Sequence, residues 1–202
     1  DAKVDEVKLP YFNISVCVSD KLMKSAQTGA DFNLVSRSNG SVVRSLNGAE
    51  LWSKLCENAW KRGDPGIFFI DRANADNLLK LDETWRIEST NPCGEQPLPN
   101  YTSCNLGSVN VEAFVERRED GNVRFDFAAF SDQVFRSMYY LDLVIDACSY
   151  PLEKIGERTR RIRPVGLGIM GLADAAILLR MRYGSERFKV FCRTLADSMG
   201  SA

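Results

Sequence analysis

The chain has 202 residues, of which 45% are hydrophobic, and its net charge is −1. This composition suits one sizeable globular core, or at most two small ones, and offers no basic excess for holding nucleic acid. There is no histidine, which excludes Ser-His-Asp and Cys-His catalysis and imidazole metal sites. No apolar run is long enough to span a membrane, and the N-terminal stretch DAKVDEVKLP lacks the regions of a signal peptide, so we expect a cytoplasmic protein.

Hydrophobic spacing and turn residues predict alternating strands and helices, which makes α/β the expected fold class. In chain order we first expect a strand over 12–18, a helix that Gly29 ends, a hairpin turning at Asn39-Gly40 and a helix over roughly 48–62. A buried strand at 66–71, an irregular stretch over 72–90, extended structure over 105–115 and a hairpin turning at Asp120-Gly121 are expected next. The rest is expected to be a long helix from Phe127, a basic helix after Pro151, a strand or turn feeding a helix over 163–179 and a final helix over about 185–199. No repeat or linker interrupts this pattern. We therefore expect one domain over residues 1–202, without a separate second domain.

Two sets of residues are expected in the core. Five residues share one face of the long helix at helical spacing, namely Val134, Met138, Leu141, Ile145 and Cys148. Four cysteines lie in apolar patterns and are interpreted as buried free thiols, namely Cys17, Cys56, Cys148 and Cys192. The chain has six cysteines and no CxxC pair, which does not indicate a disulfide scaffold.

The most informative stretch is NPCGEQPLPNYTSC, residues 91–104. Its three prolines, its glycine and its lack of a hydrophobic period argue against a helix or a regular strand. Cys93 is a candidate nucleophile, metal ligand or radical carrier on this polar loop, although metal binding would need more ligands than Cys104 and carboxylates supply.

The chemistry of the loop favours the radical carrier. The charge of Glu95, two residues away, disfavours a thiolate at Cys93, so the thiol is suited to losing a hydrogen atom as neutral S–H. Glu95 could then act as base on a substrate hydroxyl, and Asn91 could hydrogen-bond a second hydroxyl. Cys104 could fold back to act as the reductant.

A second motif, Gly-Leu-Gly-Ile-Met-Gly at residues 166–171, matches the GxGxxG fingerprint of dinucleotide-binding folds. Its context is poor, because Pro164 lies two residues before the first glycine and too little chain follows for the rest of such a fold. We expect these glycines to allow close strand–helix packing. Two alternatives stay open: an NAD-dependent dehydrogenase acting through Gly166–Gly171, and a non-catalytic structural or binding fragment in which Cys93 only packs the loop.

The loop also resembles a known family. Asn-x-Cys-x-Glu, followed by the cysteine of Ser-Cys-Asn-Leu-Gly, is similar to the finger loop of the large catalytic subunit of ribonucleotide reductases. The stretches that match this family in its order are residues 12–16, 66–71, 91–110 and 163–174. The resemblance implies a central fragment of a reductase, forming part of its ten-stranded α/β barrel, with the catalytic finger loop at about 89–106.

The resemblance also implies residue roles. Cys93 matches the cysteine that becomes a thiyl radical and abstracts the 3′ hydrogen of the ribonucleotide, and Glu95 matches the base that takes the 3′-hydroxyl proton. Asn91 matches the amide that hydrogen-bonds the substrate sugar. Cys104 matches one member of the redox pair that reduces the 2′ position. The other member should lie upstream of this chain, because Cys17 does not match that family position.

The sequence NPCGEQPL and the short interval from Cys93 to Cys104 resemble the adenosylcobalamin-dependent (class II) reductases, whereas other relatives use a separate dimetal subunit as radical generator. No cofactor-contacting residue and no metal ligand is assigned. The family implies ribonucleoside diphosphates or triphosphates as substrates, dNTP and ATP effectors bound by segments outside this chain, thioredoxin or glutaredoxin as reductant, and a homodimer completed by the rest of the reductase. The fragment alone is expected to be inactive.

Overall fold

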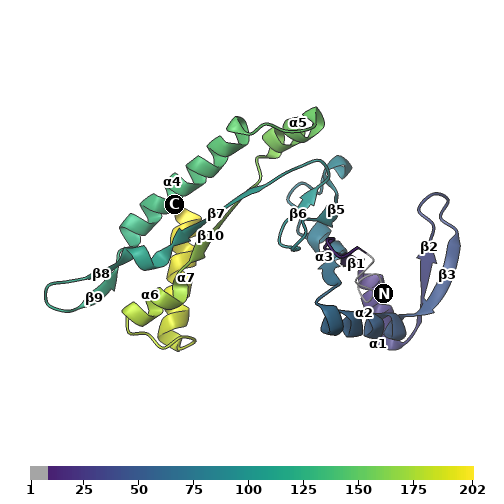
Figure 1. Ribbon diagram of the computed structural model, residues 1–202, viewed down its shortest axis with the longest axis horizontal. Helices are drawn as coiled ribbons and strands as arrows, with labels where there is room; N and C mark the ends of the chain where they lie inside the picture. Colours follow the sequence, from purple (N-terminus) through teal and green to yellow (C-terminus); the bar gives the residue numbers. More distant parts are fainter. Residues whose placement is uncertain (1–8) are drawn as a thin grey trace. The chain divides into compact units, whose positions relative to one another are not determined.

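The computed structural model describes residues 9–202, so residues 1–8 of the charged N-terminal stretch lie outside it. Strands and helices are mixed along the chain, which confirms the α/β class in its coarse form. The chain divides into two compact units, Asp1–Asn100 and Tyr101–Ala202, which run from purple to teal and from teal to yellow in Figure 1. The single domain over residues 1–202 stays a prediction.

The first unit is built on a parallel strand pair and an antiparallel hairpin. Its elements in chain order are β1 (Ser15–Val18), α1 (Asp20–Thr28), β2 (Asp31–Val35), β3 (Val42–Asn47), α2 (Gly48–Arg62), β4 (Gly66–Phe69), α3 (Ile70–Ala75), the 3-10 helix η1 (Glu83–Trp85), β5 (Ile87–Thr90) and β6 (Pro97–Pro99). β1 pairs with β4 in parallel, and β2 pairs with β3 in an antiparallel hairpin. The helix predicted to end at Gly29 is confirmed: the Ser19 Oγ accepts a hydrogen bond from the Leu22 N–H at 3.2 Å, and Gly29 closes the helix in the left-handed region.

The stretch over 72–90 is more regular than predicted. It contains the end of α3, then η1, and then β5, which pairs with β6. Only Ile87 of the four β5 residues is buried, whereas Glu88 and Ser89 are exposed. Because a strand this short buries one side chain, its sequence shows no alternation that would reveal it.

The second unit pairs two strands against a long helix. Its elements in chain order are β7 (Asn105–Asn110), the 3-10 helix η2 (Val111–Phe114), β8 (Val115–Arg117), β9 (Val123–Phe125), α4 (Phe127–Ala147), α5 (Glu153–Ile162), β10 (Val165–Met170), α6 (Leu172–Leu178) and α7 (Glu186–Ser201). β7 and β10 are parallel, from Asn105 opposite Val165 to Asn110 opposite Met170. The helix expected from Phe127 is confirmed, whereas the extended segment over 105–115 is a strand only as far as Asn110.

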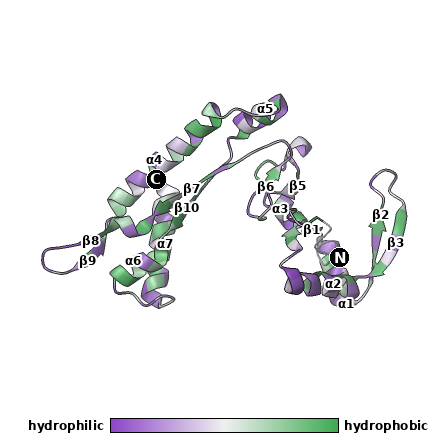
Figure 2. Cartoon of the chain, viewed as in Figure 1, coloured by the Kyte–Doolittle hydropathy of each residue, from purple (hydrophilic) through white to green (hydrophobic). Residues whose placement is uncertain are grey.

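A single cluster forms the core of this unit. Its most deeply buried members are Val111, Phe130, Ala175, Ala176 and Leu195, which come from η2, α4, α6 and α7. Phe114 meets Phe130 edge-on at 5.5 Å between ring centroids, an arrangement that aromatic pairs favour. In Figure 2, α4 is largely hydrophobic along its length, whereas α5 is largely hydrophilic. The core therefore forms where α4, α6 and α7 meet beside the β7–β10 pair.

The predicted core residues are only partly buried. On α4, Val134 and Ile145 are buried, but Met138 is 41% exposed and Cys148 is exposed. Apolar residues recur on more than one side of α4, so their spacing did not identify the covered face. The expectation of buried thiols is wrong for Cys17, Cys56 and Cys148, which are exposed, while Cys192 is half-buried.

The GxGxxG stretch is a strand rather than a phosphate-binding turn. Gly166 and Gly168 lie inside β10, opposite Leu106 and Ser108 of β7. A Cβ added at Gly166 would collide with the side chain of Leu106 on β7. This glycine therefore permits close packing against a strand, and the prediction that it packs against a helix is wrong. Gly171, in the left-handed region, opens α6. The geometry contradicts the dinucleotide-binding alternative, which needs these glycines in a turn after the strand.

All strand pairings of residues 9–202 are two-stranded: β1–β4, β7–β10, β2–β3, β5–β6 and β8–β9. The two parallel pairs join strands that are far apart in the sequence and are separated by helices, as in α/β folds. Closure into a ten-stranded barrel stays a prediction.

Candidate functional site

Residues 91–96 form the tip of a β-hairpin in the first unit. β5 and β6 pair antiparallel, with Thr90 opposite Pro97 at the top of the ladder. The prediction that residues 91–104 contain no regular strand is therefore wrong for β6. Prolines fit here because in a two-stranded ladder both strands are edges, where a missing N–H is tolerated.

The base of this hairpin is held by the side chain of Asn74 in α3. Its Nδ2 donates to the Ile87 carbonyl oxygen at 2.9 Å, and its Oδ1 accepts from the Ile87 N–H at 3.0 Å. The carboxamide thereby pairs with both backbone groups of Ile87, as a neighbouring strand would. Ile87 is itself buried, so the hairpin that carries the loop is fixed to α3 at its base.

The tip is closed by Asn91. Its Oδ1 accepts hydrogen bonds from the Gln96 N–H at 2.9 Å and from the Thr90 hydroxyl at 3.1 Å. Its backbone carbonyl accepts from the Gly94 N–H at 3.2 Å. Gly94 has a φ of 85°, a left-handed conformation that glycine adopts without strain. These bonds fold residues 91–96 into a compact turn.

Cys93 and Glu95 lie on this turn, and both are exposed. The structure therefore brings three of the four predicted site residues, Asn91, Cys93 and Glu95, into one loop. Water and small solutes reach both the thiol and the carboxylate in this chain. The loop presents a carboxamide, a thiol and a carboxylate together, of which the carboxylate can accept a proton and the carboxamide can donate a hydrogen bond.

Cys104, the fourth predicted residue, belongs to the second unit and directly precedes β7. Its half-buried thiol donates to the Asn105 carbonyl oxygen, with an Sγ···O distance of 3.4 Å. The neighbouring Ser103 N–H donates to Oγ1 of the buried Thr159 at 3.1 Å. Burial raises the pKa of the Cys104 thiol, because it disfavours the charged thiolate. This cysteine is therefore held as S–H at neutral pH.

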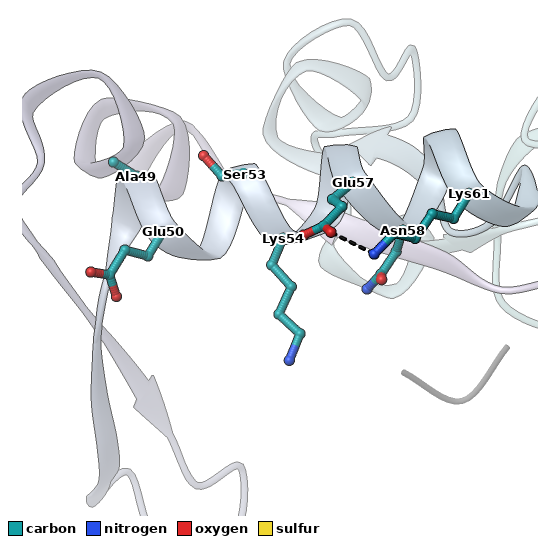
Figure 3. Close-up of a pocket in the computed structure, with 7 residues that line it drawn as sticks. All are labelled: Ala49, Glu50, Ser53, Lys54, Glu57, Asn58 and Lys61. Carbon is teal, nitrogen blue, oxygen red and sulfur yellow. Dashed lines mark hydrogen bonds and ion pairs between the residues drawn. The ribbon is translucent and has the colours of Figure 1, made fainter. Parts of the chain in front are cut away.

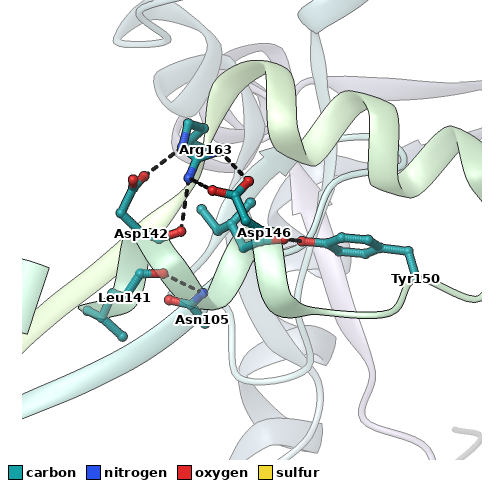
Figure 4. Close-up of polar contacts among 7 residues, drawn as sticks. Asn105, Leu141, Asp142, Asp146, Tyr150 and Arg163 are labelled. Atoms are coloured by element: carbon teal, nitrogen blue, oxygen red, sulfur yellow. Dashed lines mark hydrogen bonds and ion pairs between the residues drawn. The ribbon is translucent and has the colours of Figure 1, made fainter. Parts of the chain in front are cut away.

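A set of ion pairs, here called the α4 clamp, supports the strand that follows Cys104 (Figure 4). Arg163, just before β10, donates to Asp142 at 2.6 Å and to Asp146 at 2.8 Å and 2.9 Å. Asn105, the first residue of β7, donates its Nδ2 to the Leu141 carbonyl at 3.1 Å. The clamp thus attaches both parallel strands to the same turn of α4 at their N-terminal ends.

The charges of the α4 clamp are mutually stabilising. Hydrogen bonds from Arg163 lower the pKa of the carboxyls of Asp142 and Asp146 below their ordinary values. The same two carboxylates raise the pKa of the guanidinium of Arg163. All three side chains therefore stay ionised over the neutral range.

No sequence pattern indicated a role for Asn74, Thr90 or Arg163. The i, i+4 spacing of Asp142 and Asp146 could have indicated an arginine partner, because it places two carboxylates side by side on one helix face. The roles of Asn74 and Thr90 had no such signal, since each depends on how the hairpin folds back.

Two hollows lie along α2, and Figure 3 shows the one that is lined by Ala49, Glu50, Ser53, Lys54, Glu57, Asn58 and Lys61. Charged side chains make up more than half of this lining, whereas the second hollow mixes Arg44, Glu50 and Lys54 with Leu46, Leu51 and Leu55. Neither gives the apolar enclosure that a corrinoid ring needs, and no residue of this chain is assigned to adenosylcobalamin. Within residues 9–202, no three cysteine, aspartate or glutamate side chains are grouped to hold a metal ion. Among the helices of residues 9–202, none is long and apolar enough to cross a membrane.

Comparison with known proteins gives a consistent result. A family model described as "Ribonucleotide reductase, barrel domain" matches residues 1–201. A vitamin B12-dependent ribonucleoside-diphosphate reductase of Thermoplasma acidophilum is 41% identical over 88% of this chain, which covers 22% of that relative. A protein of the same name from Mycobacterium tuberculosis is 39% identical over 89% of the chain and 25% of the relative. A vitamin B12-dependent ribonucleotide reductase of Streptomyces coelicolor is 36% identical over 97% of the chain. The chain spans about a fifth to a quarter of the length of these relatives.

Proposed function

Because this chain belongs to the ribonucleotide reductase barrel-domain family, we propose that it supplies the finger loop on which a reductase converts ribonucleotides to deoxyribonucleotides for DNA synthesis. The observation that carries the proposal is the hairpin tip at residues 91–96, which presents a thiol, a carboxylate and a carboxamide from one closed turn. Groups held on one turn can act on neighbouring atoms of a single ribose without an entropic cost of assembly.

In the proposed reaction, the thiyl radical of Cys93 takes the hydrogen atom from the 3′ carbon of the ribose and becomes S–H again. Glu95 accepts the proton of the 3′-hydroxyl, as a carboxylate base does. Asn91 hydrogen-bonds the sugar. The exposure of Cys93 and Glu95 on one turn supports this assignment, because a ribose can then reach the thiol and the carboxylate together.

Cys104 is proposed as one thiol of the pair that reduces the 2′ carbon and is left as a disulfide. Its protonated, half-buried state supports the role, because both the hydrogen and the electrons of the thiol are consumed. Its partner is proposed to lie in a part of the reductase outside this chain, and thioredoxin or glutaredoxin is proposed to restore the pair.

The rest of the assembly is proposed from the relatives. Their names support a reductase that depends on vitamin B12, and two of them support a ribonucleoside diphosphate as the substrate. The parallel pairs β1–β4 and β7–β10 are proposed as parts of an α/β barrel that the remaining reductase completes. Effector sites are proposed to lie outside residues 1–202, and the reductase is proposed to be a homodimer.

The central test is Cys93→Ser in the full-length reductase. We expect deoxyribonucleotide formation to be abolished, because a serine hydroxyl does not form the radical that the step requires, while substrate binding is largely retained. Product formation is measured by chromatography of the nucleotides, and binding by equilibrium dialysis with the ribonucleotide.

Cys56→Ser is the matched control, because Cys56 is also an exposed thiol of the first unit but lies on α2. It should leave turnover unchanged. Retained turnover in Cys93→Ser would contradict the radical assignment and support the alternative in which this cysteine only packs the loop.

A further inference from the structure

The side-chain oxygen of Asn91 is already fully used inside the hairpin. A carboxamide oxygen has two lone pairs, and here the Gln96 N–H and the Thr90 hydroxyl both donate to it, at 2.9 Å and 3.1 Å. We propose that Thr90 is a positioning residue of the finger loop, whose hydroxyl locks the Asn91 carboxamide so that this side chain meets the substrate only as a hydrogen-bond donor.

The orientation of the carboxamide follows from its neighbours. Oxygen and nitrogen of an asparagine side chain are told apart by their hydrogen-bond partners. A backbone N–H, here that of Gln96, can only donate, so the atom beside it must be Oδ1. The Nδ2 group, with its two N–H donors, is then the part of Asn91 that the loop does not use.

The Thr90 hydroxyl adds something that the Gln96 N–H cannot. With one donor, Oδ1 would keep a free lone pair, and a sugar hydroxyl could give its hydrogen to Asn91. That contact would compete with proton transfer to Glu95, which lies on the same turn. With both lone pairs filled, Asn91 can contact only an oxygen lone pair of the sugar, and the hydroxyl hydrogen is left for the carboxylate. This consequence rests on the proposed function, whereas the lock itself does not.

Thr90→Val in the full-length reductase tests the lock, since valine has nearly the same shape but no hydroxyl. Losing one neutral hydrogen bond corresponds to about a five-fold fall in kcat/KM. Thr90→Ser keeps the hydroxyl and is expected to restore the wild-type value, with the temperature of thermal unfolding unchanged across the series. Ser89→Ala is the matched control, because it removes an exposed hydroxyl one residue earlier on the same strand.

The pattern that supports the proposal is a loss in Thr90→Val alone. A Thr90→Val enzyme as active as wild type, a loss that Thr90→Ser does not restore, or an equal loss in Ser89→Ala would each overturn it.

A second measurement needs no turnover. Hydrogen exchange of the Gln96 amide, followed by mass spectrometry of the full-length protein, is expected to be slow in wild type and in Thr90→Ser, which keeps the hydroxyl, and faster in Thr90→Val, in which the Asn91 carboxamide that accepts from this amide is free to turn. Equal exchange in all three proteins would overturn the lock. Because this result does not involve Cys93, it stays decisive even if Cys93→Ser retains turnover and the proposed function fails.

Discussion

The two proposed redox-active cysteines differ in their surroundings in a way that fits different tasks. Cys93 is exposed on a turn beside Glu95, where it can meet a substrate. Cys104 is half-buried, with its thiol donating to the Asn105 carbonyl and its pKa raised by burial. A radical carrier needs access to the sugar, whereas a two-electron reductant needs protection from unspecific oxidants, which attack the thiolate form.

Cys104→Ser should separate these tasks in the full-length reductase. Hydrogen abstraction by Cys93 does not need the Cys104 thiol, but the 2′ reduction does, so the reaction is expected to stop after an abortive first step. The measurement is deoxyribonucleotide formed per active site with thioredoxin present, and Cys148→Ser serves as control because Cys148 is an exposed thiol of the same unit. Sustained turnover in Cys104→Ser would contradict the redox role.

At this scale the sequence indicates which chemical groups are available but not how they are held. Residue types and spacing selected Asn91, Cys93 and Glu95 as one group, and the structure places them on a single turn, while their catalytic roles stay predictions. The use of the Asn91 oxygen depends on Thr90 and Gln96 meeting it after the chain folds back. No local sequence pattern predicts these contacts.

Among the elements, prediction succeeded where local signals agree. The helix expected over 48–62 is α2, Gly48–Arg62, because Asn47 accepts hydrogen bonds from the backbone N–H groups of Ala49 and Glu50 and Gly63 ends the helix in the left-handed region. β5 and β6 were missed because their strands are short and rich in polar residues and proline. Their stability comes from partners that are not adjacent in sequence, such as Asn74.

The α4 clamp gives an element-scale prediction about pH. Hydrogen bonds from Arg163 lower the folded-state pKa of Asp142 and Asp146, so the stabilisation is present above the unfolded carboxyl pKa of about 3.9 and is lost as pH falls through the lower folded values. Asp146→Asn should therefore lower the temperature of thermal unfolding by a few degrees at pH 7, with the difference from wild type shrinking towards pH 2.

The control is Asp132→Asn, since Asp132 pairs only with Arg136 on the same helix and both side chains are about two-thirds exposed, where ion pairs contribute little. In the clamp, Arg163 is 33% exposed and bonds two carboxylates. Scanning calorimetry between pH 2 and pH 7 measures both variants. An Asp146→Asn protein whose deficit is the same at every pH, or no larger than that of Asp132→Asn, would show that the clamp does not stabilise the fold.

For the molecule as a whole, the long-range strand pairing was the part that local patterns could not supply. β1 pairs with β4 and β7 with β10, each across intervening helices, and hydrophobic spacing says that a strand exists without saying which strand it joins. The family resemblance, by contrast, predicted the family, which the match over residues 1–201 confirms. Since the chain spans about a fifth to a quarter of its relatives, surfaces exposed in it have further reductase chain available to cover them.

The outer face of α4 is such a surface. Phe135, Tyr139 and Leu143 follow one another at helical spacing and are 60%, 57% and 42% exposed. Apolar residues aligned along one helix face are the pattern of a buried contact, so we expect this face to be covered in the full-length reductase.

Phe135→Asp should then lower the free energy of unfolding of the full-length reductase by at least about 2 kcal/mol, the cost of re-exposing a buried aromatic ring, as measured by urea denaturation. Arg136→Ala, at the adjacent and exposed position, should have little effect; equal stability of the two variants would mean that the face stays in water.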